Sequence, residues 1–508
     1  MGSAGAGTSG QRSSRAGAGL PARARRWTCA LLLGAALAAG PGAARAYDFV
    51  LTSRTIGQGY AERRYGAGGG SELLTRRRLT QYLNLSVFGI EPDHWHGPDA
   101  DRNLISFEVA MRFDGDFGTY LTRRPSSPDA IGELQQSQVD ILYAYLLARD
   151  VGGHLDVQLG RQLHYDLVDF YSFDGVDAQA HIGRFVTAQA FAGTEVRGDM
   201  PLSAPIYELD GTSSGSRDPA TRPEQSSAWR PMVGAALALG DTLRSWPAEL
   251  RVAYRKAFSD TVDPRPGDPG SGVNHESVSM TADARFRDRL FLSAGARYNL
   301  LVAAWDDQQA SLRWRIGARH ALSAEYSYLA PTFDGDSIWN IFAAGAYRDL
   351  RASYDVELTA RWRAHVRGFY RLFVDPPGTP AALADAMPGG HDAYGGNAGV
   401  ELRTVRGRAR ADGYAEGGAG GWKVGGDLSA YWNIRPNLFD VEGRLTATAW
   451  RSDDVPQPQD AFMVGGGLGC VYHLGRKMRV HFLGEDNSGT YYRAQVRGLA
   501  ILEMDVTL

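Results

Sequence analysis

The 508-residue chain contains little cysteine and no long apolar run beyond its first 46 residues. Its two cysteines are Cys29 and Cys470, so the chain after residue 46 has a single cysteine and forms no internal disulfide. Because no stretch of about 20 apolar residues occurs in this part, a bundle of membrane-spanning helices is excluded. Hydrophobic residues still make up 44% of the chain and charged residues 22%, which argues against a disordered protein.

Recognisable catalytic and metal-binding motifs are missing as well. The chain has no G-x-S-x-G motif, no H-E-x-x-H motif and no cysteine cluster. His94 and His96 lie two residues apart in DHWHG, but the pattern implies no third ligand, so we expect a polar turn there. We therefore expect no enzymatic activity, no cofactor and no resident metal ion.

Residues 1–46 have the composition of a cleaved secretory signal peptide. Three arginines within residues 23–26 precede an apolar stretch at residues 27–39, and Ala44 and Ala46 fit an A-x-A cleavage site. Removing the six arginines of this segment leaves 48 basic and 57 acidic residues, a net charge of −9. That negative charge disfavours nucleic acid as a partner.

Strict alternation of apolar and polar residues runs through the rest of the chain. In NLISFEVAMRF, residues 103–113, five apolar side chains share one face and Glu108 and Arg112 share the other. Such alternation indicates β-strands with one apolar face. The pattern recurs in segments of about ten residues, among them HESVSMTADARF, RLFLSAGARYNLLV, QASLRWRIG and ALSAEYSYL.

The connections between these segments fall into two classes that largely alternate. Short connections lie near residue 151 and at 287–289, 318–320, 405–407 and 474–476. Long connections lie at 114–136, 197–228, 259–275, 331–346 and 374–395. Short periplasmic turns that alternate with long extracellular loops are typical of an outer-membrane β-barrel.

We predict that residues 47–508 form one all-β, antiparallel transmembrane barrel of about 20–22 strands. About 20 strands run from Leu104 to Leu508, and two candidates at residues 47–58 and 79–89 complete the higher count. A soluble β-propeller is the alternative, but it requires internal repeats that the sequence lacks. An energised receptor is disfavoured because strand-like sequence begins without a plug domain before it.

Residues at strand ends and at the C-terminus agree with an outer-membrane location. Four tryptophans share the outward parity of the aliphatic residues, as aromatic belts require: Trp314, Trp362, Trp422 and Trp432. The last strand alternates up to Leu508, where outer-membrane barrels usually have an aromatic residue. We expect bilayer lipid, lipopolysaccharide and the barrel-assembly machinery as partners in the bacterial outer membrane.

The predicted inward face is rich in arginine. Seven arginines are candidates for lining a pore: Arg297, Arg313, Arg315, Arg361, Arg363, Arg367 and Arg371, the last four on one predicted strand. In a narrow, partly dehydrated passage such arginines favour anions. The alternative is that they pair with wall carboxylates in a wide lumen, and the sequence leaves both interpretations open.

One stretch, LGRQLHYDLVDFYSFDGVDAQAH at residues 159–181, resembles the alginate-export type of outer-membrane porin. The matching positions are Gly160, Arg161, Gln162, Phe173, Asp174 and Gly175. The resemblance implies a monomeric barrel that passes anionic sugar polymers through an arginine-lined pore. The chain departs from that family in its higher strand count and in its terminal Leu508, so the substrate is not carried over.

The expected function is a passive outer-membrane channel for small or polymeric hydrophilic solutes, with anionic solutes as one candidate class. A non-conducting barrel that serves as an adhesion or assembly platform, or as an enzyme scaffold, is the alternative. Conductance in planar bilayers distinguishes the two.

Overall fold

The structure is a computed structural model, and it describes eleven segments of the chain. These segments are residues 48–66, 70–90, 104–116, 137–183, 185–196, 230–241, 247–258, 272–330, 346–374, 392–453 and 459–507. The expected signal peptide and the DHWHG sequence lie outside the described residues. No helix in the described segments is long and apolar enough to cross a membrane.

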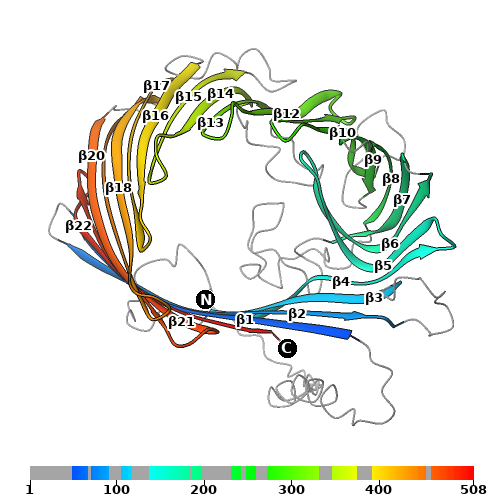
Figure 1. Ribbon diagram of the computed structural model, residues 1–508, viewed down its shortest axis with the longest axis horizontal. Coiled ribbons are helices and arrows are strands. Elements are labelled where there is room, and N and C mark those ends of the chain that lie inside the picture. Colours follow the sequence, from blue (N-terminus) through cyan, green and yellow to red (C-terminus); the bar gives the residue numbers. More distant parts are fainter. Residues whose placement is uncertain are drawn as a thin grey trace, which may run out of the picture. The chain divides into compact units, whose positions relative to one another are not determined.

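Twenty-two antiparallel strands form one sheet that closes on itself (Figure 1). Each strand pairs with its neighbours in sequence, and β1 pairs with both β2 and β22, which completes the ring. The strands are β1 Asp48–Gly66, β2 Ser71–Phe88, β3 Ile105–Asp116, β4 Ser137–Val151, β5 Leu155–Tyr165, β6 Phe170–Ile182, β7 Val186–Glu195, β8 Pro231–Asp241, β9 Ala248–Phe258, β10 Val273–Phe286, β11 Leu290–Asn299, β12 Ala304–Arg315, β13 His320–Leu329, β14 Ala346–Glu357, β15 Trp362–Val374, β16 Asp392–Arg403, β17 Gly407–Gly418, β18 Gly421–Arg435, β19 Phe439–Ser452, β20 Gln459–His473, β21 Met478–Gly489 and β22 Tyr492–Thr507.

The closed antiparallel barrel confirms the predicted fold class and the higher of the two strand counts. Both candidate N-terminal strands are present as β1 and β2, and they are longer than the alternation predicts. The five short connections all join strands at the rim that holds Asp48 and Thr507, here called the terminal rim. The five long connections all join strands at the opposite rim.

The two faces of the wall follow the predicted parity. On the inner face of the first strands, Arg112 donates to Asp140 over 2.7 Å and Tyr145 donates to Glu108 over 2.8 Å. On the outer face, large apolar side chains such as Leu445 are 60% exposed. The outward tryptophans lie near the rims: Trp314, Trp362 and Trp432 near the terminal rim, and Trp422 near the opposite one.

The β5–β6 hairpin departs from the simple wall by folding inward (Figure 1). In the described chain its pairing with β4 ends at Arg161, and its pairing with β7 ends at Phe173. Beyond these points the hairpin lies over the inner face of β7–β11. Phe173 there packs with Phe191, Met232 and Ala257 in a small buried apolar cluster.

Two glycines explain why the hairpin bends at this level. Gly160 and Gly175 are cross-strand partners, and Gly160 has a φ of +129°, which favours glycine. A Cβ at Gly160 would lie 2.2 Å from the Ala144 carbonyl oxygen, and one at Gly175 would lie 2.1 Å from that of Ala192. The two neighbouring strands therefore approach this hairpin too closely for any side chain.

The six residues that carry the porin resemblance form three successive cross-strand pairs at this bend. Next to the glycine pair, Arg161 donates to both carboxylate oxygens of Asp174 at 2.8 Å, and Gln162 lies opposite Phe173 on the other face. Arg161 also donates to the Ile141 carbonyl oxygen of β4. The motif thus fastens the hairpin where it leaves the wall.

The assignment of faces is tested by two adjacent residues in the middle of β19. Arginine at Leu445, on the outer face, should lower the free energy of unfolding by about 2–4 kcal/mol if that face meets lipid. Arginine at Thr446 should be tolerated, because this residue faces inward and lies opposite Asp427. Urea unfolding in lipid vesicles measures both variants, and equal destabilisation would contradict the assignment.

Candidate functional site

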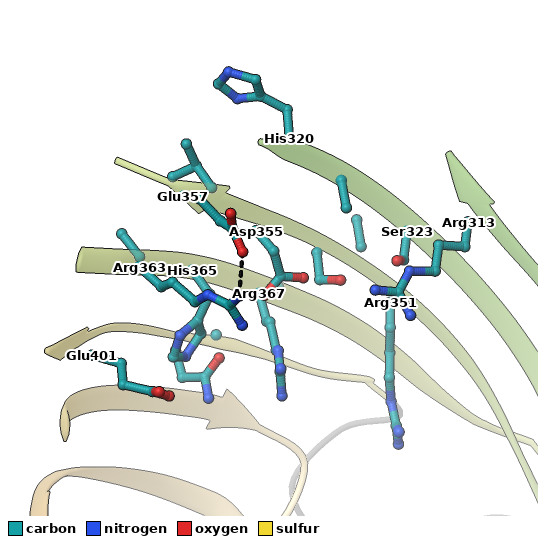
Figure 2. A pocket seen from close by; sticks show the side chains of 18 of the residues that line it. Arg313, His320, Ser323, Arg351, Asp355, Glu357, Arg363, His365, Arg367 and Glu401 are labelled. Carbon is teal, nitrogen blue, oxygen red and sulfur yellow. Dashed lines mark ion pairs between the residues drawn. The ribbon is translucent and has the colours of Figure 1, made fainter. Parts of the chain in front are cut away.

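A cavity of about 1150 Å³ lies against the inner wall of strands β12–β18 (Figure 2). Nine lysine and arginine side chains line it, against six aspartates and glutamates. The basic residues are Arg313, Arg315, Arg319, Arg351, Arg363, Arg367, Arg403, Arg410 and Lys423. The acidic residues are Glu325, Asp355, Glu357, Glu401, Glu416 and Asp427. This local excess of positive charge contrasts with the negative net charge of the chain after residue 46.

Arg313 and Arg367 are two predicted pore-lining arginines whose side chains are available to meet a solute in the cavity. They lie in one cross-strand row, separated only by Ser323 and Ser353. Three strand steps of about 4.8 Å place their backbones about 14 Å apart. Neither side chain forms an ion pair with a described residue, and both point into the cavity in Figure 2.

Three other predicted pore-lining arginines have partners on the wall. Arg363 pairs with Glu357, as the dashed line in Figure 2 marks. Arg371 donates to Asp349 over 2.6 Å. Arg315 lies over the ring of Phe291, with its guanidinium carbon 5.1 Å from the ring centroid. Pairing with wall carboxylates therefore holds for Arg363 and Arg371, and not for Arg313 and Arg367 among the described residues.

Arg371 and the remaining two predicted arginines, Arg361 and Arg297, lie outside the cavity. Arg361 is not on β15, contrary to the prediction of four arginines on one strand. The Thr359 hydroxyl accepts hydrogen bonds from the backbone N–H groups of Arg361 and Trp362, which holds a turn at this point. Arg297 lies on β11 and binds Asp306 over 2.9 Å, so it contributes to the hairpin anchor described next.

The tip of the β5–β6 hairpin is anchored to the inner face of strands β9 and β11. Asp169 accepts hydrogen bonds from Arg255 Nε and Nη2 at 3.1 and 3.0 Å, and both side chains are buried. Arg297 Nη1 donates to the Val168 carbonyl oxygen over 2.7 Å. Within the turn, Asp166 Oδ1 accepts the backbone N–H of Val168 and of Asp169. The tip is therefore a fixed part of the lumen wall.

Sequence reasoning missed several residues of this arrangement. Arg351 and Lys423 line the cavity, and the apolar alternation of β14 and β18 places both on the inner face, which is the signal that could have found them. Asp169 and Arg255 are 86 positions apart, so their pairing has no local signal. The one hint at the hairpin tip is the DLVD sequence at residues 166–169, because aspartate at its first position favours a tight turn.

No family model matches the chain, and no curated protein matches its sequence. Solved structures with a similar arrangement come from Pseudomonas aeruginosa. OccK3 (OpdO) has 9% identity and a TM-score of 0.42, covering 91% of this chain and 96% of its own. OccK8 (OprE) has 7% identity and a TM-score of 0.42 (90% and 98%), and the outer membrane protein opdK has 9% and 0.35 (91% and 99%). These sequence identities and TM-scores are too low to indicate the function of this chain.

The hairpin anchor is tested by the Asp169→Asn substitution, which removes the carboxylate but keeps the side-chain size. Removing one partner of a buried ion pair costs about 3 kcal/mol or more. Backbone amides of residues 162–172 should therefore exchange with deuterium about 100-fold faster or more.

Asp427→Asn is the matched control, because Asp427 pairs with Arg444 on a solvent-exposed part of the wall. Its hairpin amides should exchange at the wild-type rate. Unchanged exchange in Asp169→Asn would show that the anchor does not hold the hairpin.

Proposed function

We propose that the chain is an outer-membrane channel whose lumen passes small hydrophilic anions. The observation that carries this proposal is the pair Arg313 and Arg367, which lie in one row of a basic cavity without an ion pair to a described residue. Charged side chains that line a pore set which ions enter it. The large closed barrel with an apolar outer face supports a location in the outer membrane.

Wall carboxylates keep the attraction moderate. Six acidic side chains share the cavity with the nine basic ones, and several of the latter are paired, such as Arg363 with Glu357 and Arg351 with Asp349. A permeating anion therefore meets a few free guanidinium groups rather than a continuous ladder. Conduction needs sites that are attractive enough to enter and weak enough to leave, and this balance supports transport over tight binding.

Anionic sugar polymers, the solutes implied by the alginate-export resemblance, stay a narrower proposal. The six residues that carry the resemblance form the bend of the β5–β6 hairpin and do not line the cavity. They fasten the hairpin where it leaves the wall and add nothing about the solute. Small anions are therefore the class that the described residues favour.

The double substitution of Arg313 and Arg367 by glutamine tests the proposal. A unit charge about 10 Å away contributes about 0.4 kcal/mol in water at low salt, so each arginine favours anion entry about twofold and disfavours cation entry about twofold. The anion/cation permeability ratio should thus fall by up to about sixteenfold for the pair. Reversal potentials in a potassium chloride gradient across planar bilayers measure this ratio, and the effect should shrink at high salt.

A second double variant serves as the control. Substituting both Arg363 and Glu357 by glutamine removes an ion pair without changing the net charge of the cavity, so the ratio should stay near wild type. An unchanged ratio in the Arg313 and Arg367 variant, with the barrel folded, would contradict anion guidance. Absence of any conductance in the wild type would favour the non-conducting platform.

A further inference from the structure

The inward fold of the β5–β6 hairpin reverses the environment of its outer face. Below the bend, Leu159 and Val176 of this face belong to the outer wall and are exposed there. Beyond the bend, the other face of the hairpin is buried against the inner wall through Phe173 and through Tyr171, which the Arg255 guanidinium overlies at 4.8 Å. Two stacked sheet layers lie about 10 Å apart, so the hairpin forms an inner layer. Its remaining face points away from the wall, into the lumen.

Near the tip that lumenal face carries apolar side chains, while the Arg161–Asp174 ion pair and Ser172 share the face closer to the bend. Tyr165 and Phe170 are cross-strand partners at the end of the hairpin, and their side chains are 79% and 70% exposed. Leu163 adds to the same face. The Asp166 turn and the Asp169 anchor hold this surface at the tip, and the Arg161–Asp174 ion pair holds it at the bend. Two exposed aromatic side chains at the end of an anchored hairpin are suited to contact the apolar face of a ring.

The hairpin tip beside the aromatic pair contacts β11, three strands from Arg351 of the basic cavity. Gly295 on β11 is the contact point of the hairpin tip, since a Cβ there would lie 2.9 Å from Leu167 and Val168. From Gly295 one cross-strand row runs through Gln309 and Ser327 to Asp349, the partner of Arg351. Three strand steps amount to about 14 Å. A solute in the lumen can therefore contact the apolar side chains of the hairpin tip and the guanidinium groups on strands β12–β18.

We propose that Tyr165 and Phe170 form a subsite for solutes that combine a negative charge with a ring that has an apolar face. This inference rests on the proposed anion channel and specifies its substrate class. The ring is either aromatic or the C–H face of a sugar ring, because both present an apolar plane to an aromatic side chain. The basic cavity attracts the charge, and the hairpin selects ring-bearing anions over compact ones.

Saturation-transfer NMR on the full-length protein in detergent tests the subsite without relying on conduction. The probes are benzenesulfonate for an aromatic ring, glucuronate for a sugar ring and methanesulfonate for a charge without a ring. At least one ring-bearing probe should bind more tightly than methanesulfonate. Serine at both Tyr165 and Phe170 should weaken that binding about threefold to tenfold, the usual effect of losing aromatic contacts.

The conservative exchange of Tyr165→Phe with Phe170→Tyr keeps both rings and should retain the binding. Because both side chains are largely exposed, the serine variant should keep the fold, and hairpin deuterium exchange checks this. Equal binding of all three probes, or full binding in the serine variant, would overturn the subsite. The wild-type reversal potential in potassium chloride reports separately on the anion channel, so failure of the channel and failure of the subsite are distinguishable.

Discussion

The backbone N–H and C=O groups of the two edge strands of a sheet need hydrogen-bond partners. Here β1 and β22 would be the edge strands, and their pairing satisfies both. This ladder runs from Thr52–Thr507 to Gly66–Tyr492, nearly the whole length of β1. With the ring closed, one face of every strand can be apolar and the other polar without leaving an edge exposed. The outer apolar surface, the inner charged surface and the space between opposite walls all depend on this closure. In a bilayer, closure is also the condition that lets strands cross hydrocarbon.

Inside the ring, charge pairing and hairpin folding divide the lumen into regions with different chemistry. On the β12–β18 side, arginines exceed acids, and the row that contains Arg313 and Arg367 is left without wall partners among the described residues. On the β7–β11 side, the β5–β6 hairpin covers the wall and is fixed by Asp169 and Arg255. The glycine pair at the bend makes this covering possible, because no side chain fits between the strands there. Solute preference in this account arises from the basic wall and the hairpin acting on the same passage.

Much of the fold is predictable from the sequence because strand parity and connection length are local signals. The alternation in NLISFEVAMRF correctly places Glu108 and Arg112 on the inner face, and the alternation of short and long connections correctly separates the two rims. The inward hairpin is not predictable in this way, since its outer residues Tyr165 and Phe170 have the same parity as lipid-facing ones. Arg361 shows the same limit. A turn held by the Thr359 hydroxyl precedes β15, and Arg361 lies in this turn instead of in the strand. Which arginines stay unpaired depends on neighbours far away in sequence, such as Asp349 for Arg371.

The most direct test of the central claim, that the lumen attracts anions at the Arg313–Arg367 row, is anomalous diffraction from crystals of the protein soaked in bromide. The account predicts bromide within hydrogen-bonding distance of Arg313 or Arg367, and more weakly along the paired arginines of β15. Bromide that avoids this row, together with rubidium bound near Glu325 or Asp355 in a parallel soak, would contradict it.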